Sequence, residues 1–244
     1  MTQLRLKVLP TKSDLVKTDI ILSGHPLFND LPLSTLVDLV KTNPNLHGYI
    51  QGYLAEAHLK AQLEALPGVE SVTKIPDSSE EKGDLLVVYK GVPLSLEVKS
   101  VASNSVKEEL LHGGWSGVIR CKSSDKKTYE VEGREVTSTH LIKGLFDGLA
   151  VCTFNATETW EFFFMTAHSL PEPDGVAGVV KTQFRVNPVI ESEVYLDAQR
   201  FLDHLYTLKS AHDDLHGQRN RQWIDSVLHL QRDRYESLDR ESHL

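Results

Sequence analysis

The spacing of apolar residues predicts an amphipathic helix that begins near Leu46. Apolar residues recur there at intervals of three and four, the period of one helix face, and Pro67-Gly68 ends the run. The apolar positions are Leu46, Tyr49, Ile50, Tyr53, Leu54, Ala57 and Ala61. We expect this face to pack on the rest of the domain, with Glu56 at its border. A shorter apolar pattern predicts another helix over 33–40.

After this helix, β-rich runs predict strands over 69–75, 84–89 and 92–99, and Lys90-Gly91 has the composition of a two-residue hairpin turn. Such a turn would make Leu85 face Leu96 and Asp84 face Glu97. Because strand side chains alternate, one face of the hairpin would then be entirely apolar. That face carries Leu85, Val87, Tyr89, Val92, Leu94, Leu96 and Val98.

The rest of the chain mixes helical and strand patterns, which predicts an α/β (α+β) fold with its sheet in the middle of the chain. The expected elements are a mixed helical stretch from Ser100 to His112, a hairpin of 117–122 with 127–131, a helix over 137–145, buried strands over 148–154 and 160–166, and helices over 193–212 and 219–241. The predicted divisions are an N-terminal arm (1–45), a core (46–170) with an inserted hairpin (100–139), and a helical C-terminal section (171–244) that serves as a dimerisation surface or a lid.

Composition is that of a globular protein. The chain has 244 residues, of which 40% are hydrophobic, and no apolar run approaches the roughly 20 residues that span a bilayer. The two cysteines, Cys121 and Cys152, form no CxxC pair and cannot build a disulfide framework. We therefore expect a cytoplasmic protein without a membrane partner.

Charge is unevenly distributed. The whole chain has a formal charge of −8, yet residues 99–143 carry 8 basic and 6 acidic side chains, a net of +2. The basic residues gather with aromatic ones, which is typical of a surface that binds a phosphate backbone. They are Arg120, Lys122, Lys126, Lys127 and Arg134, beside Trp115 and Tyr129. A solvated hairpin face is the alternative interpretation.

The predicted pairing of Asp84 with Glu97 places two like charges opposite each other, which is unfavourable in a sheet unless a cation compensates them. Mg²⁺ is commonly held by one or two carboxylates together with water and phosphate oxygens. Lys99 projects on the same face, where an ammonium can orient water and offset transition-state charge. Glu56 would bind a second metal or orient Lys99. The competing interpretation is an ordinary surface hairpin whose end forms a salt bridge.

The helix with Glu56, the segment Lys82-Gly83-Asp84-Leu-Leu-Val-Val and the segment Leu96-Glu97-Val98-Lys99-Ser100 together resemble the PD-(D/E)xK nuclease superfamily, which includes most type II restriction endonucleases. The resemblance implies a restriction-endonuclease-like core, a central mixed β-sheet flanked by helices. It implies that Asp84, Glu97 and the Val98 backbone carbonyl bind metal, that Lys99 is catalytic and that Glu56 is the helical acidic residue. Pro76-Asp77 shows the proline–aspartate dipeptide that is missing before Asp84, so Asp77 is the alternative ligand.

From these features we expect an endonuclease that uses Mg²⁺, for which Mn²⁺ can substitute, and that needs no nucleotide cofactor. The expected substrate is double-stranded DNA cut at a specific site, and the resemblance implies 5′-phosphate and 3′-hydroxyl ends. Cutting a symmetric site would require a homodimer. The alternatives are a structure-specific repair or recombination nuclease and a non-catalytic DNA-binding module. The expected DNA contacts are Arg120, Lys122, Ser124, Asp125, Lys126, Lys127 and, from the helix at 137–145, Lys143.

Overall fold

The computed structural model describes residues 5–9, 19–23, 31–77, 83–109, 114–131, 134–174 and 178–216. Within these ranges, side chains are described from Pro32 onward, apart from 123–139 and 211–216. The chain forms two compact units, Met1–Leu54 and Ala55–Leu244. No helix among the described residues is long and apolar enough to cross a membrane.

The first unit contains a small antiparallel sheet of β1 (Arg5–Leu9), β2 (Asp19–Ser23) and β3 (Leu31–Pro32), in that order. The helix α1 (Leu33–Thr42) follows directly, and it confirms the helix predicted over 33–40. The first half of the 21-residue helix α2 (Pro44–Glu64) belongs to the same unit. These three strands were not predicted from the sequence, although Arg5-Leu6-Lys7-Val8 in β1 alternates charged and apolar residues.

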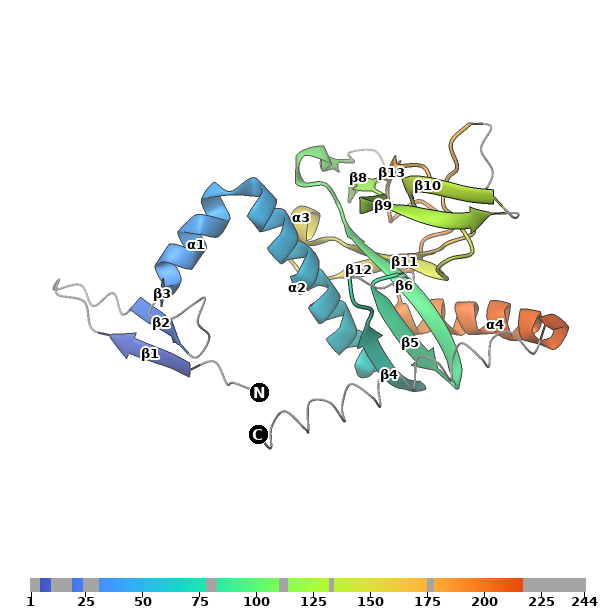
Figure 1. Ribbon diagram of the computed structural model, residues 1–244, viewed down its shortest axis with the longest axis horizontal. Coiled ribbons are helices and arrows are strands. Elements are labelled where there is room, and N and C mark those ends of the chain that lie inside the picture. The colour runs from blue at the N-terminus through green and yellow to red at the C-terminus, as the bar shows by residue number, and fades with distance from the viewer. Residues whose placement is uncertain are drawn as a thin grey trace. The chain divides into compact units, whose positions relative to one another are not determined.

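The second unit is built on a five-stranded sheet with the order β12-β11-β6-β5-β4 (Figure 1). The strands are β4 (Val69–Lys74), β5 (Leu85–Tyr89), β6 (Val92–Ser100), β11 (Gly148–Cys152) and β12 (Phe162–Thr166). Only β11 and β6 pair in parallel; the other three pairs are antiparallel. The fold is therefore α+β with a central mixed sheet and flanking helices, as the sequence predicts.

The β5–β6 hairpin has the predicted register. Tyr89 pairs with Val92 and Leu85 with Leu96, and Lys90 and Gly91 both have positive φ, at 50° and 76°. Two successive residues with positive φ are the mark of the turn that matches the twist of a tight hairpin. The apolar face of the hairpin lies in the main core, as expected.

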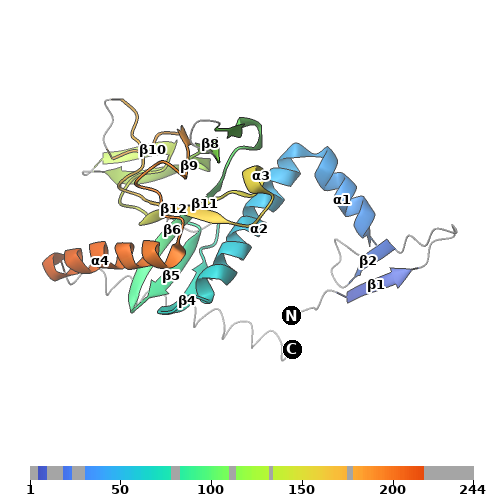
Figure 2. The same ribbon diagram turned by 180° about the vertical axis from the view of Figure 1, so that it is seen from behind.

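Two helices cover that face of the sheet, α2 and α4 (Ala198–His216), as Figure 2 shows from behind. The face that α2 buries is not the one predicted: Ala55, Leu59 and Leu63 are buried, whereas Tyr49 and Tyr53 are exposed. Apolar residues occur on more than one side of this helix, so the period alone does not select the buried side. The side chains that pack on the sheet are spaced four residues apart along α2, and the first of them is the small Ala55. Glu56 still borders the buried row, since it follows Ala55 directly.

A second core lies on the other face of the sheet, where the side chains of Leu149, Val151, Phe163 and Met165 meet a smaller sheet with the order β13-β8-β7. Its strands are β7 (Lys107–Glu108), β8 (Trp115–Arg120) and β13 (Gln183–Val186). The mixed helical stretch predicted up to His112 is wrong, because the chain there forms a 3₁₀ turn (Ser103–Ser105) and β7. Ser105 closes this turn through hydrogen bonds to Ala102 and Val118, which replace those of a helix.

The hairpin predicted over 117–131 is also wrong. β8 pairs with β7 and β13, while β9 (Lys122–Val131) pairs with β10 (Arg134–His140) in a separate two-stranded sheet. The helix predicted over 137–145 is therefore absent: its first residues lie in β10, where β-branched side chains favour the extended backbone. The short helix α3 (Phe154–Thr157) joins β11 to β12. α4 begins five residues later than predicted, and the helix predicted over 219–241 lies outside the described residues.

Candidate functional site

Asp84 and Glu97 come together at the open end of the β5–β6 hairpin. Asp84 directly precedes β5, and its Oδ2 accepts a hydrogen bond from the main-chain N–H of Val98 at 2.7 Å. Its own N–H donates to the carbonyl of Leu96 at 2.8 Å. Two bonds from opposite ends of the residue thus fix the Asp84 carboxylate against β6. Because the N–H and C=O of one strand residue point to the same neighbour, the Val98 carbonyl is directed toward the Asp84 side.

Gly83 is the backbone position that allows this approach. It has φ +92°, and a Cβ placed on it would lie 2.4 Å from Oγ of Ser95 and 3.0 Å from the carbonyl oxygen of Leu96. Any other residue would be strained in this conformation and would collide with β6. Gly83 thereby brings Asp84 close to the strand that carries Glu97.

The two carboxylates destabilise each other's charge. Burial and, after it, the nearby charge of Glu97 raise the pKa of Asp84 to about 7, against the opposing effects of Lys99 and the Val98 N–H. Glu97 itself is buried, with 8% of its surface exposed. The two carboxylates therefore concentrate negative charge, which the ammonium group of Lys99 compensates only in part.

Lys99 supplies that compensation. It lies two residues after Glu97 on the same side of β6, and its Nζ donates to Glu97 Oε1 at 2.5 Å. Burial lowers the pKa of Lys99, but the charges of Glu97 and Asp84 outweigh burial, so the net shift is upward. Lys99 therefore remains an ammonium ion at neutral pH.

Cys121 lies beside the same group, immediately after β8. The pKa of its thiol is raised to about 12, mainly by burial. The charge of Lys99 opposes this rise, and the charge of Glu97 adds to it. The side chain is fully buried in the second core. It marks where the smaller sheet meets the end of β6.

Glu56 is near this group but is engaged elsewhere. Its Oε2 accepts from Lys74 Nζ at 2.5 Å, and Lys74 also forms an ion pair with Asp77 at 3.4 Å. Glu56 contributes a smaller upward effect to the pKa of Asp84. Asp77, the alternative ligand, is the more exposed partner of Lys74, with 63% of its side chain accessible. The structure thus brings Asp84, Glu97 and Lys99 together and places Glu56 and Asp77 around Lys74.

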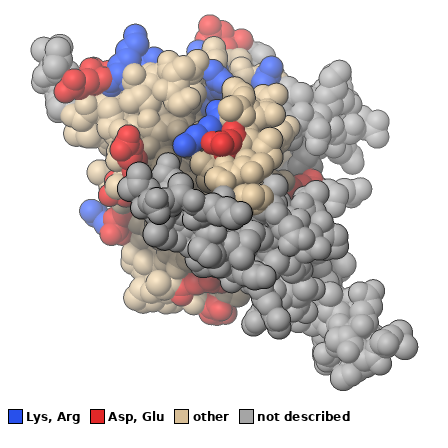
Figure 3. Space-filling view, turned by 90° about the vertical axis from the view of Figure 1, so that its left-hand side faces the viewer, with Lys and Arg blue, Asp and Glu red and all other residues tan. Residues whose placement is uncertain are grey.

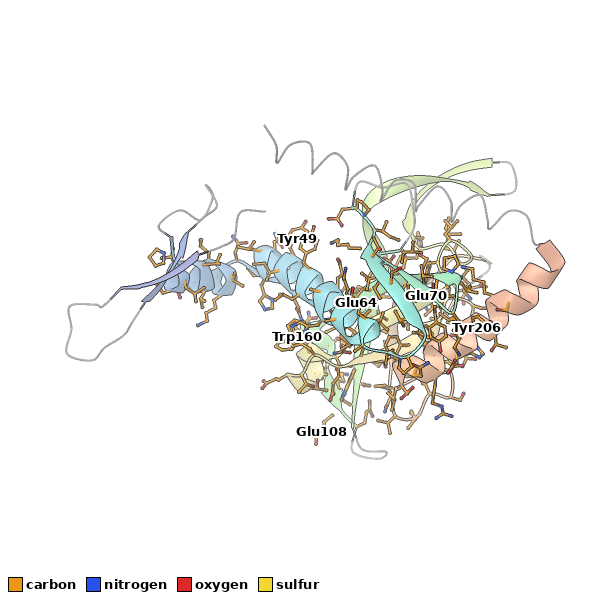
Figure 4. The ribbon with its side chains drawn as sticks, turned by 90° about the horizontal axis from the view of Figure 1, so that it is seen from below. Tyr49, Glu64, Glu70, Glu108, Trp160 and Tyr206 are labelled. Carbon is orange, nitrogen blue, oxygen red and sulfur yellow. The ribbon has the colours of Figure 1, made fainter. Side chains whose placement is uncertain are left out.

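The helix that carries Glu56 is anchored by an aromatic stack. The rings of His58 and Phe154 each lie 4.4 Å from the ring of Trp160, and Gln62 donates to the Trp160 carbonyl at 2.7 Å. Figure 4 shows Trp160 beside α2 and Tyr206 on α4. It also shows Glu64 and Glu70 where the chain passes from α2 into β4. These contacts hold Glu56 at a fixed position along the sheet edge.

The donor set fits a hard divalent cation of one particular kind. Among the residues that the structure describes, no three His, Cys, Asp or Glu side chains form a closed metal cage. Two carboxylates and a directed carbonyl instead leave positions for water and for phosphate oxygens, which is how Mg²⁺ is usually bound beside a phosphate substrate. A cation between Asp84 and Glu97 would also remove the repulsion that raises the Asp84 pKa.

The residues predicted to contact DNA are placed less uniformly. Arg120 and Lys122 are exposed near the end of β8 and the start of β9. Ser124, Asp125, Lys126 and Lys127 lie on β9, and their side chains are outside the described residues. Lys143 is not on a helix: it lies in a turn, donates to the His168 carbonyl at 2.8 Å and pairs with Glu172 at 3.1 Å. The prediction that it projects from a helix is wrong.

The sequence analysis missed two groups that shape the site. Lys74, which pairs with Glu56, is the last residue of β4, a correctly predicted strand, but nothing local indicates its partner. Asp147 accepts from the Ser95 N–H at 2.7 Å and pairs with Lys209 of α4 at 2.8 Å, so it joins three elements behind the site. The link from Asp147 to α4 depends on Lys209, a residue 62 positions later in the chain.

No protein-family model matches the chain, and no curated protein sequence matches it. Among solved structures, one that resembles the chain is a bacterial homing endonuclease, I-Ssp6803I. The sequences are 15% identical, the match covers 68% of this chain and 97% of that one, and the TM-score is 0.38.

Proposed function

We propose that the protein is a Mg²⁺-dependent endonuclease that hydrolyses DNA phosphodiester bonds, of the PD-(D/E)xK type. The observation that carries the proposal is the meeting of Asp84 and Glu97 at one end of a hairpin, with Lys99 bonded to Glu97 on the same side. Buried like charges are costly to keep. A site that keeps them is suited to bind a cation.

In this proposal each residue has a separate task. Asp84, Glu97 and the Val98 carbonyl hold the cation, which when bound acts as a Lewis acid on the scissile phosphate. Lys99 stays protonated, so it acts as a hydrogen-bond donor that orients the attacking water and stabilises negative charge at phosphorus. Water adds to phosphorus and the P–O3′ bond breaks, which leaves a 5′-phosphate and, after proton transfer to the leaving oxygen, a 3′-hydroxyl.

Glu56 has a supporting task. Its carboxylate forms an ion pair with Lys74, which compensates most of its charge, and only a small negative potential from it reaches Asp84. This arrangement favours one cation between Asp84 and Glu97.

The test is incubation of the purified full chain with plasmid and phage DNA, with and without Mg²⁺. Discrete fragments support a site-specific restriction enzyme; cutting of branched DNA alone supports a repair or recombination nuclease. Glu97→Gln should abolish cutting, whereas Glu70→Gln, on an exposed position of β4, should leave it unchanged. If the wild-type protein hydrolyses no DNA with Mg²⁺ or Mn²⁺, the proposal is wrong.

Specific cutting of both strands at a symmetric sequence adds a second expectation, namely that two copies of the chain act together. Sedimentation of the protein with and without cleaved DNA measures this directly. A monomer that makes symmetric double-strand cuts would contradict it.

A further inference from the structure

The smaller sheet β13-β8-β7 has one covered face and one exposed face. Ile119 and Val186 are fully buried in the second core. Because strand side chains alternate, their neighbours Arg120 and Arg185 lie on the opposite, outer face. The register agrees: Gln183 pairs with Arg120, and Arg185 pairs with Val118.

The outer face is basic and polar. Lys107 pairs with Ser116, which places it on the same face as Arg120 and Arg185. Its neighbour Glu108 pairs with Trp115, which packs against the core, so Glu108 belongs to the opposite side. Lys107, Arg120, Gln183 and Arg185 are all exposed. We call these four residues the basic face.

The arginines of the basic face are held in place without losing their charge. Nη1 of Arg185 donates to the Ser105 carbonyl at 3.1 Å and to Ser116 Oγ at 3.0 Å, and Arg120 Nη2 approaches Asn104 Oδ1 at 3.4 Å. In the part of the chain that the structure describes, every salt bridge uses a lysine and neither guanidinium pairs with a carboxylate. A guanidinium has five donors in a planar fork that matches phosphate and the guanine edge.

The basic face adjoins the candidate catalytic strand. Val101, just beyond β6, bridges to Ile119, and the Ala102 N–H donates to the Val118 carbonyl at 2.9 Å. A Cβ on Gly117 would lie 2.4 Å from Val101 Cγ1, so glycine is what lets β8 come this close. Glu97 and Lys99 alternate with the residues of β6 that face α2 and α4, so they project on the side of the second core, to which Val101 and Ile119 also belong.

On the one face that Figure 3 shows, basic and acidic side chains lie in small groups, several of them side by side, with neutral areas between these groups. The chain carries −8 overall, so a polyanion is attracted only where unpaired cations gather.

We propose that the basic face binds duplex DNA next to the end of β6, with Arg120 and Arg185 as the main contacts. This inference rests on the proposed function and names the surface through which the substrate is recognised. Lys107 and Gln183 extend the contact along the sheet.

The test measures binding separately from cutting. Labelled 30-base-pair duplexes of mixed sequence are titrated with the full-length protein in Ca²⁺, and anisotropy is recorded at several salt concentrations. Arg120→Ala and Arg185→Gln should each weaken binding about 10-fold and lower the slope of log affinity against log salt by about 1. Arg120→Glu, at an exposed position, should weaken it further without affecting folding. The matched control is Arg200→Ala, an exposed arginine at the start of α4, on the covered side of the sheet.

The outcomes separate the two proposals. If the wild type binds and cuts DNA but Arg120→Glu and Arg185→Gln bind within twofold of it with an unchanged salt slope, the basic face is not the DNA surface and the proposed function stands. Equal loss in Arg200→Ala would also overturn the inference, because the effect would then be one of net charge. If the variants lose binding as expected but the wild type never cuts, the basic face is supported and the nuclease proposal fails.

Discussion

The main-chain N–H of Val98 donates a hydrogen bond of 2.7 Å to the carboxylate of Asp84. Asp84 lies just before the first residue of β5, whereas Val98 lies within β6. The side chain of Asp84 takes the place of a backbone acceptor in the ladder. The peptide that follows Glu97 is thus tied to the opposing carboxylate, so the two acidic residues keep a fixed separation. Five predictions test what this arrangement implies.

The raised pKa of Asp84 predicts how stability depends on pH. A carboxyl with a folded-state pKa of about 7 and an ordinary value of 3.8 binds its proton more tightly in the folded protein, so the metal-free protein loses stability as the pH rises from about 4 to 7. The contribution is at most about 1.4 kcal/mol per pH unit. Urea unfolding in EDTA at pH 5, 6, 7 and 8 measures it. Asp84→Asn should flatten this dependence; an equal slope in that variant would contradict the assignment.

Glu97→Gln and Lys99→Met should each reduce Mg²⁺-dependent cleavage by at least about 100-fold, because each removes a charge that acts on the transition state. The two differ in their effect on folding. Glu97→Gln leaves the ammonium of Lys99 without its closest partner and should lower the free energy of unfolding by about 1–3 kcal/mol. Lys99→Met leaves two carboxylates unopposed and should make folding more dependent on divalent cations. Thermal melts with and without Ca²⁺ distinguish the two variants.

Gly83→Ala should lower the free energy of unfolding by about 1–3 kcal/mol and displace Asp84. The new Cβ would collide with Ser95 Oγ, and the alanine would have to adopt a positive φ. Gly91→Ala is the matched control: its φ is +76°, but nothing lies within 4 Å of its Cβ position. We expect Gly83→Ala to weaken Ca²⁺ binding in calorimetry and Gly91→Ala to leave it unchanged. Part of the loss should return when Ser95→Ala is added, because the closest clash is with the serine hydroxyl.

Lys74→Met should tighten divalent cation binding about 2-fold to 10-fold, because it leaves the charge of Glu56 uncompensated near Asp84. Lys60→Met removes a comparable cation from the same region, one that pairs with Glu64 at the surface of α2 at 3.5 Å, and should have no effect. Calorimetry with Ca²⁺ gives both affinity and stoichiometry. Binding of two ions in the wild type would contradict the expectation of one.

Cys121 should resist alkylation in the folded protein. Its thiol is buried, and burial raises its pKa to about 12, so almost no thiolate forms at pH 8. Cys152 is also buried, and burial raises its pKa as well. Mass spectrometry after iodoacetamide treatment should show both cysteines modified only in urea. Rapid labelling of Cys121 without denaturant would mean that β8 separates from the end of β6.

The hairpin could be predicted from sequence because its determinants are local. Lys90-Gly91 fixes the turn, and the turn fixes the register from Tyr89–Val92 to Leu85–Leu96. The predicted pairs therefore match the structure residue by residue. No distant part of the chain has to be known for this step.

Other features depend on partners far away in the chain, and these were missed or predicted wrongly. The buried side of α2 is selected by the sheet and by Trp160, about 100 residues later. β13 has an alternating pattern, Gln183-Phe184-Arg185-Val186, that signals a half-buried strand, but its partner β8 lies more than 60 residues earlier. The pairing of Glu56 with Lys74 and of Asp147 with Lys209 arises only in the folded chain.

The parallel pairing of β11 with β6 has a consequence for how the protein tolerates changes in length. Asp84 and Glu97 are connected through a two-residue turn, whereas the chain that leads from β6 to β11 passes through the smaller sheet and the β9–β10 pair. Insertions or deletions in that long connection change the entropic cost of closing it, and this cost grows only slowly with length. They leave the spacing of the two acidic residues unchanged. The reach and shape of the surface presented to a partner can therefore be redesigned, or can diverge between relatives, while the chemical centre keeps its dimensions.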